Sequence, residues 1–494
     1  MNNKLLIGFS EISLTPDRRV SLSGQFAPRL SDSVETPVTA TAMAVTTGGD
    51  QFVLCSCDLV AVSTALQAEV RRQLRDTVDD LDTDKVILCA THTHTSLLYH
   101  REAAVSSLAV LRRYLPHPPE AAPVPDDVMT PQEAFDFLAE RITAAVRTAW
   151  QARRPASVGF GFGRAVVGLC RRAVFNDGSA AMWGDTNQAV FDHLEGGNDS
   201  GIELMYIYGD QRRPAGIVAN IACPAQCVQH RHFISSDYWG EVRARLRERL
   251  GAHLPVVGLC GAAGDQCPVD LVRWVEPETP LDDPNITRPH PIRRRADPSM
   301  FDLPGKRTVG RRIADEILAV QEGAAANLSD DLPLTHQVLT LDLPVRRVTP
   351  SEYQEARQAL ESYLREQNKS GDFNDDARMH VHAGTIARYE YQFDHDLRPV
   401  ETHVIRFGDI AIATNPFELF LDYGNQMRAR SLAAQTFIVQ LACGSEGYLP
   451  TARAERGGHY SAYVSSGITG HAGGDLLVRH TLAAINALFP LTNA

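Results

Sequence analysis

The chain has 494 residues, of which 44% are apolar and 22% charged, and its formal net charge is −12. This is ordinary globular composition, and the length allows one large domain or two to three smaller ones. Because no run of basic residues is longer than Arg293–Arg295 in this acidic chain, a surface that follows nucleic-acid phosphates is excluded, and we expect no nucleic-acid partner.

The cysteines and the amino terminus bear on the compartment. Nine cysteines are scattered without a CxxC pair, which favours reduced thiols over a disulfide framework. The apolar run in Met1–Ile7 is far shorter than the core of a secretory signal. No stretch approaches the roughly 18–20 apolar residues of a membrane-spanning helix. We therefore expect a cytoplasmic protein without stable membrane association.

Short apolar runs alternate with amphipathic stretches along the chain, a rhythm that predicts an α/β fold with a mixed sheet core flanked by helices. Residues 114–127 and 275–305 interrupt it and are predicted to be long surface loops. We expect one elaborated domain over residues 1–494, with a subdivision near residue 330 as the alternative. The predicted strands are Gln51–Leu59, Lys85–Ala90, Gly216–Ala222, Leu254–Leu259, Leu332–Arg347 and Val404–Thr414, and the predicted helices are Ala65–Asp76, Tyr238–Leu250 and Pro350–Glu366.

Thr91–Thr95 carries the strongest chemical signal, the pattern Thr-His-Thr-His-Thr directly after the apolar strand Val86–Ala90. Because strand side chains alternate, His92 and His94 should point to the same side, about 6.5–7 Å apart along the backbone. Open α/β sheets place ligand sites at the carboxyl ends of strands, and neutral imidazole is a favoured zinc ligand. The alternative is a pair of hydrogen-bonded histidines at a strand end.

A second candidate segment is Ile221–His232, which offers Cys223, His230 and His232 as metal donors. Asp237 follows it and is placed to cap the next helix. The structural alternative is that Cys223 is a small buried hydrophobe and Asp237 only a cap.

Two later segments add a carboxylate and a phenol. The strand Ile410–Thr414 breaks just before Glu418, which takes the position of a carboxylate at a strand-to-helix junction or, alternatively, of a first-turn glutamate that favours the helix dipole. Gly447–Thr451 and Gly457–Tyr460 form a glycine-rich loop that carries tyrosines. An ordinary loop is the alternative for both segments.

In order and spacing, these motifs together resemble the catalytic domain of the neutral/alkaline (non-lysosomal) ceramidases. The resemblance covers nearly the whole chain, and it implies that family's catalytic-domain fold. The motifs that carry it are Gly8–Ile12 with Thr15-Pro16, Cys57–Leu59, Ala90–Thr95, Ser236–Gly240, Gly264–Pro268, Met300–Asp302, Pro416–Glu418 and His459-Tyr460.

The resemblance implies a Zn²⁺ ion held by two histidines, a glutamate and a tyrosine, with a bound water that attacks an amide carbonyl. Carried over residue by residue, His92 is the first ligand, Glu418 the carboxylate ligand and Tyr460 the phenol or phenolate ligand. Zinc chemistry suits this reaction, because the ion lowers the pKa of its water to about 7 and polarises the carbonyl.

The resemblance also implies residues that act on substrate and water. His94 becomes the proton shuttle or transition-state donor, and Arg171, or its neighbour Arg172, lies beside it. Asp58, in the second-strand motif, is carried over as a further catalytic residue. A histidine and an arginine in these places stabilise a developing oxyanion.

The sequence departs from the family pattern in ways that bear on mechanism and substrate. The second ligand histidine falls on Cys223, so that either its thiolate or His230 is expected to complete the metal shell. The serine of the family's Gly-Asp-x-Ser-Pro motif is Cys267 here, which weakens a serine-nucleophile mechanism. Because the sequence ends at Ala494, we expect the fold to lack the family's carboxyl-terminal β-sandwich.

Because membrane-docking features are missing, we expect a small soluble substrate instead of a membrane lipid. The favoured reading is an amidohydrolase that cleaves an N-acyl bond. The alternatives are an esterase, lactonase or glycoside-cleaving enzyme on the same metal site, and a non-catalytic homologue that binds a metal or ligand. A homo-oligomer is left open.

Overall fold

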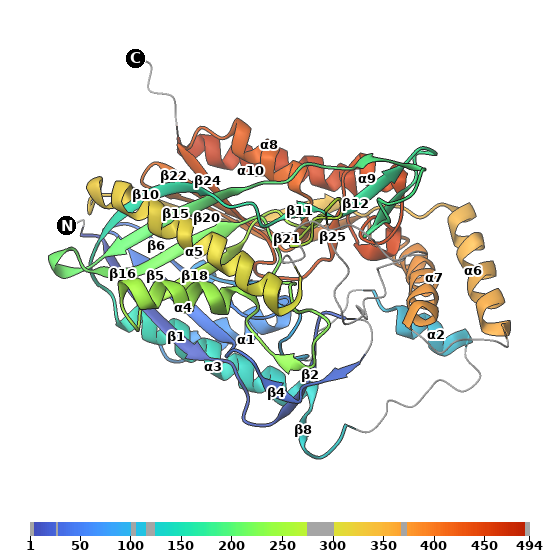
Figure 1. The fold of residues 1–494 in the computed structure, drawn as a ribbon, viewed down its shortest axis with the longest axis horizontal. Coiled ribbons are helices and arrows are strands. Elements are labelled where there is room, and N and C mark those ends of the chain that lie inside the picture. The colour runs from blue at the N-terminus through green and yellow to red at the C-terminus, as the bar shows by residue number, and fades with distance from the viewer. Residues whose placement is uncertain are drawn as a thin grey trace.

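The computed structural model describes residues 4–25, 28–99, 105–114, 124–273, 301–366 and 373–489. The architecture is mixed α/β, as the sequence predicts, and is built on three sheets of four or five strands (Figure 1). Their strands, in spatial order, are β7 (Val86–Ala90), β6 (Gln51–Cys57), β5 (Thr39–Thr46), β1 (Leu6–Ser13) and β9 (Arg154–Pro155); then β10 (Ser157–Arg164), β15 (Gly201–Tyr208), β16 (Pro214–Ile221) and β18 (Val256–Cys260); and last β20 (Leu334–Pro344), β21 (Leu397–Phe407), β22 (Ile410–Thr414) and β24 (Gln435–Val439).

The three sheets share one plan. Antiparallel strands come first, and a helix then leads to a parallel strand at the edge of the sheet. The connecting helices are α1 (Thr64–Arg75), α4 (Tyr238–Leu250) and α8 (Leu421–Arg430). Each sheet therefore ends in a parallel pair, and ligand sites form at the carboxyl ends of such pairs.

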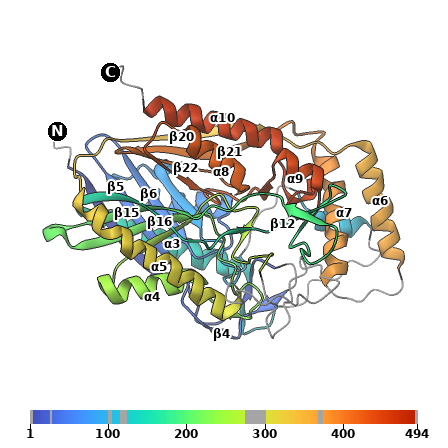
Figure 2. The ribbon, with the colours of Figure 1, turned by 45° about the horizontal axis from the view of Figure 1, so that its top comes forward.

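One apolar core joins the inner faces of the three sheets, with Phe52, Met205 and Ile412 among its fully buried members. Helices cover each outer face, as Figures 1 and 2 show. Strands that are covered on both sides are apolar along their whole length, which explains the continuous runs in the sequence. The covering helices are α1 with α3 (Pro131–Gln151), α4 with α5 (Asp302–Ala326), and α8 with α10 (His471–Leu488).

A smaller group of helices packs at one end of the molecule (Figure 1). It consists of α2 (Ser107–Tyr114), α6 (Pro350–Arg365) and α7 (Phe373–Tyr391), which bury Leu111 and Leu360 between them. In the described parts of the chain, no helix is long and apolar enough to cross a membrane.

Short elements complete the connections between these layers. They are β2 (Arg19–Leu22), β3 (Arg29–Leu30), β4 (Ser33–Val34), β8 (Val128–Met129), β11 (Leu169–Cys170), β12 (Arg172–Phe175), β13 (Ala180–Met182), β14 (Phe191–Leu194), β17 (Phe233–Ile234), β19 (Gln266–Cys267), β23 (Glu418–Leu419), β25 (Tyr448–Leu449) and α9 (Ala452–Gly457).

The predicted elements are present, with one correction. The apolar run Val404–Thr414 is two antiparallel strands, because the chain turns at Gly408, whose φ of 64° suits glycine. Of the predicted loops, residues 115–123 and 274–300 lie outside the described residues, and α5 already begins at Asp302. The division of the chain into domains stays a prediction.

Candidate active site

His92 is held just beyond β7 by a hydrogen bond that decides which ring nitrogen faces the site. Its φ of 66° lies in the left-handed region, which few residues other than glycine adopt. Its Nδ1 lies 2.6 Å from the carbonyl oxygen of Val60. Because a carbonyl only accepts, Nδ1 carries a hydrogen, and in the neutral ring Nε2 presents a lone pair, the form of imidazole that binds a metal.

Two further polar side-chain atoms lie close to Nε2 of His92. Glu418 Oε2 is 3.3 Å away, and His94 Nε2 is 3.2 Å away. Two atoms bound to one tetrahedral zinc at about 2.0–2.1 Å are themselves about 3.3 Å apart. Since a lone pair and a carboxylate repel each other unless a proton or cation lies between them, the spacing and the donor chemistry of the His92 and Glu418 pair fit two ligands of one zinc ion.

Glu418 reaches His92 from the third sheet. It begins β23, which pairs in parallel with β25, and its N–H donates to the carbonyl of Gly447. A Cβ at Gly264 would come within 2.3 Å of the Glu418 carbonyl oxygen, so only glycine allows this close packing. Burial raises the pKa of Glu418, but His92 and Arg171 more than offset this and hold it below its ordinary value. The carboxylate is therefore ionised at neutral pH.

Arg171 is the arginine that the structure brings to this site. It is buried and donates to Gln226 Oε1 at 3.1 Å and to the Tyr448 hydroxyl at 3.2 Å. Burial lowers the pKa of Arg171, whereas the surrounding ionisable groups, Tyr448 first among them, raise it above its ordinary value. Arg172 instead forms an ion pair with Glu195 at 2.7 Å. Arg172 is thus engaged in its own ion pair, whereas Arg171 contacts residues at the site.

Gln226 fixes the protonation form of His94. Arg171 can only donate, so the amide oxygen of Gln226 faces Arg171 and its nitrogen faces His94 Nε2, 2.7 Å away. The amide donates, and His94 Nε2 is the acceptor. Burial, and then the charges of His92 and neighbouring arginines, hold the pKa of His94 well below its ordinary value. His94 is therefore a neutral ring at neutral pH.

A pair of tyrosines closes the side of the site next to Glu418. The rings of Tyr448 and Tyr460 meet edge to face with centroids 5.4 Å apart. Tyr448 is hydrogen-bonded to Glu418, and burial raises the pKa of its phenol well above the ordinary value. Tyr448 thus touches the carboxylate directly, and Tyr460 packs against Tyr448.

Cys223 and His230, the expected alternatives for the second ligand, are held by other partners. The Cys223 thiol is buried and donates to the carbonyl of Val167 at 3.4 Å. Burial raises its pKa well above the ordinary value, so that it remains a thiol. His230 stacks on Phe301 with centroids 5.2 Å apart, and its Nε2 is 3.6 Å from Asp302.

Asp58 forms a buried ion pair with Arg243 and contacts the histidine motif. Its carboxylate accepts from Arg243 at 2.6 and 3.0 Å and from the backbone N–H of Thr39 at 2.9 Å. It also accepts from the hydroxyl of Thr91 at 3.3 Å, the residue before His92. These contacts connect Asp58 to the motif through Thr91 and through the backbone.

The structure thus brings His92, His94, Arg171 and Glu418 together. Sequence reasoning missed Gln226 and Tyr448, which touch them. Gln226 lies in Ile221–His232, but its amide is not a typical metal ligand. Tyr448 lies in the glycine-rich loop, and its sequence context does not indicate a contact with Glu418. The pairing of β23 with β25, which no local pattern indicates, brings Tyr448 to Glu418.

Asp265, which follows Gly264, makes a pH-dependent contribution to stability. It is 4% exposed and accepts from the N–H of Leu421 at 2.9 Å. Burial raises its pKa from 3.8 to about 6. Between these values the folded state binds more protons than the unfolded state, so this contribution falls as pH rises from about 4 to about 6.

We expect Asp265→Asn to remove that loss. At about 1.4 kcal/mol per pKa unit, the stability of the wild type relative to the variant should fall by roughly 3 kcal/mol between pH 4 and pH 7. Denaturant unfolding at several pH values measures the difference. Parallel profiles for the two proteins would contradict the assignment.

The arrangement of the sheets and helices is that of the neutral ceramidase fold, in agreement with the motifs in the sequence. A neutral ceramidase from Pseudomonas aeruginosa matches over 100% of this chain and 76% of its own, with 15% identity and a TM-score of 0.66. A structure described as ceramidase complexed with C2 matches over 100% and 77%, with 13% identity and a TM-score of 0.65. No family model and no curated protein matches the sequence.

Proposed function

We propose that the protein is a zinc-dependent hydrolase that cleaves an amide (N-acyl) bond in a soluble substrate. The observation that carries the proposal is the position of His92 Nε2, which lies 3.3 Å from Glu418 and 3.2 Å from His94. The bond type follows from the likeness of fold to ceramidases, which is an analogy and not a property of the site. The cytoplasmic location stays a prediction.

In this proposal, His92 and Glu418 would hold the metal, and Tyr460, which packs against Tyr448, would be the phenol ligand. When bound, zinc supplies a water of lowered pKa and polarises the scissile carbonyl. We leave Cys223 and His230 out of the ligand set. A buried thiol that donates to a carbonyl and a ring stacked on Phe301 are both engaged elsewhere.

Arg171 is placed to stabilise the negative charge that develops on the carbonyl oxygen. Its guanidinium is charged and buried, and its Nε–H has no hydrogen-bond partner among the described residues. A buried donor without a partner is costly. An oxyanion bound at this nitrogen would satisfy it, and such donors strengthen in a site that excludes water.

His94 can take a proton from the attacking water and deliver it to the leaving nitrogen. It is neutral, and its Nε2 lone pair accepts from the Gln226 amide that Arg171 orients; this lone pair takes the proton when the water replaces the amide as its partner. Gln226 therefore acts as a positioning residue for the proposed base. The side chain of Glu418 is 17% exposed, against 6% for that of His92, so solvent reaches the site from the Glu418 side.

Turnover measured on matched substrate panels tests this function. We expect hydrolysis of N-acyl amides, its loss after chelation, and its recovery with added Zn²⁺. Turnover that survives chelation contradicts the metal assignment. Activity confined to esters, lactones or glycosides contradicts the bond assignment, and bound ligand without any turnover would indicate a non-catalytic homologue.

A further inference from the structure

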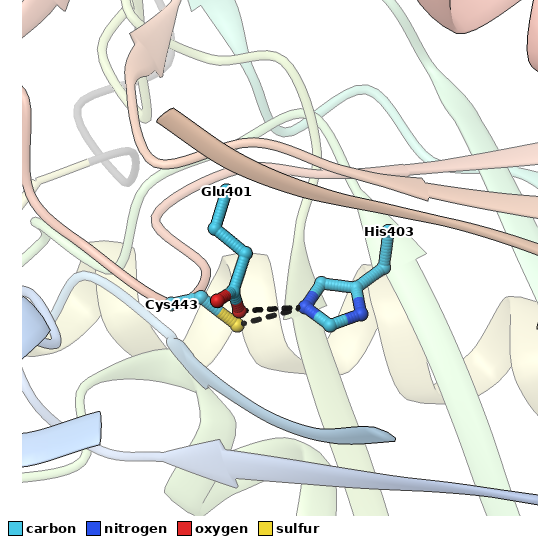
Figure 3. A group of neighbouring side chains, drawn as sticks. All are labelled: Glu401, His403 and Cys443. Carbon is cyan, nitrogen blue, oxygen red and sulfur yellow. Dashed lines mark hydrogen bonds and ion pairs between the residues drawn. The ribbon is translucent and has the colours of Figure 1, made fainter. Parts of the chain in front are cut away.

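A second cluster of ligand-type side chains lies between β21 and the segment after β24, apart from the residues proposed for catalysis. Glu401 and His403 are two residues apart on β21, so their side chains share one face of the strand. Cys443 approaches that face from the segment after β24, where its N–H donates to the carbonyl of Leu88. Figure 3 shows the three side chains pointing toward one another.

The ligand atoms of this cluster have the spacing of a metal site. His403 Nε2 lies 2.9 Å from Glu401 Oε1 and 3.4 Å from Cys443 Sγ. For bonds of about 2.0–2.1 Å to nitrogen and oxygen and about 2.3 Å to sulfur, tetrahedral zinc places these pairs about 3.3 and 3.6 Å apart. The three ligand atoms lie within 4.8 Å of one another, and among the described residues no other group of three or more His, Cys, Asp and Glu side chains meets this spacing.

A chain of hydrogen bonds sets the form of His403. His336 Nδ1 lies 3.0 Å from the carbonyl of Gln51, so it carries a hydrogen. In the neutral ring, His336 Nε2 then accepts from His403 Nδ1, 2.8 Å away. His403 Nε2 is left with a lone pair that faces the Glu401 carboxylate at 2.9 Å. Two acceptors at this distance need a proton or a metal cation between them.

The surroundings hold the ligands in place. Arg71 donates to both oxygens of Glu401, at 2.8 and 2.9 Å, and fixes the carboxylate. Cys443 has a φ of 58°, a left-handed conformation that places its side chain against His403. Such strain persists only where the surrounding structure imposes it, and it gathers at functional sites.

Solvent can reach this cluster along Glu401, because its side chain is 31% exposed while that of His403 is fully buried. An ion therefore has a route in, and water a route to the open coordination position. The imidazole, carboxylate and thiol together form the mixed set of donors that zinc accepts.

We propose that Glu401, His403 and Cys443 form a second transition-metal site of the zinc class, with water as the fourth ligand. On binding, the Cys443 thiol releases its proton to solvent, and the ion takes the thiolate, the carboxylate and the His403 lone pair. This site joins β21 to the segment that leads to Tyr448, so it supports that segment without contacting substrate.

Cobalt binding to the full chain tests the proposal, because a thiolate ligand gives Co²⁺ a charge-transfer absorption that nitrogen and oxygen ligands do not give. The double variant His92→Ala, Glu418→Ala removes the ligands of the candidate active site. After chelation, it should bind one Co²⁺ per chain and show this absorption. Adding Cys443→Ser should abolish the absorption, whereas adding Cys170→Ser, at another buried cysteine, should preserve it.

A second measurement avoids a substitution at the cluster itself. Added Zn²⁺ should raise the unfolding temperature of the His92→Ala, Glu418→Ala variant, because a ligand of the folded state stabilises it. The proposal is overturned if this variant gives neither the absorption nor the shift. Absorption that persists after Cys443→Ser overturns it equally. In either case the proposed hydrolase is unaffected, since its own test uses turnover.

Discussion

Replacing His92 with alanine should abolish turnover and remove the metal from the candidate active site. His92 Nε2 lies 3.3 Å from Oε2 of Glu418, the other proposed ligand, and 3.2 Å from Nε2 of His94, the proposed base. Loss of a residue that only supports a ligand typically costs 10–100-fold in metal affinity or activity. Loss of the ligand itself should therefore lower kcat/KM by more than about 100-fold.

Metal analysis and steady-state kinetics of the purified variant measure both effects. His232→Ala is a suitable control, because His232 is exposed and belongs to Ile221–His232, the segment whose side chains the sequence offers as metal donors. The control should retain metal and turnover. If His92→Ala kept both, the assignment of His92 as a metal ligand would be wrong.

Arg243→Met should destabilise the protein by about 3–5 kcal/mol, the range for breaking one partner of a buried ion pair. The Asp58 and Arg243 side chains are 0% and 4% exposed. Removing the arginine leaves the carboxylate charged and buried, although Thr39 and Thr91 still donate to it. Denaturant unfolding gives the change in free energy directly.

An exposed pair provides the comparison. Arg72 binds Glu69 at 2.7 Å, but its side chain is 56% exposed, so Arg72→Met should cost at most about 1 kcal/mol. Equal effects of the two substitutions on the free energy of unfolding would show that the buried ion pair contributes no more to stability than the exposed one. If Asp58 also acts in catalysis, Asp58→Asn would lower kcat much more than Arg243→Met does at a comparable loss of stability.

The sequence predicted the elements and the histidine motif because their signals are local. Apolar runs mark strands that are covered on both faces, and the residues just beyond two of those strands include His92 and Glu418. The geometry of the motif differs from the expectation. The two imidazoles do face each other, with 3.2 Å between their Nε2 atoms, but the strand ends at Ala90 and His92 is left-handed, so alternation along a strand is not what brings them together.

The parts that could not be predicted depend on contacts between distant segments. Gln226 touches His94 from 132 residues away, and an amide carries no metal-ligand signal of its own. In the second cluster, Glu401 and His403 have a spacing that places them on one strand face. Cys443 completes the group only because the segment after β24 reaches Leu88. The shared plan of the three sheets also leaves no repeat in the sequence.

Because each of the three sheets supplies residues at its end, the candidate active site forms only when the sheets pack together. His92 and His94 follow the first sheet, Arg171 and Gln226 come from segments around the second, and Glu418 follows the third. No single sheet with its helices carries enough of these groups to act alone. During folding, turnover should therefore appear only after the three layers have closed on their common core, so that catalysis would report on the last docking step of the molecule.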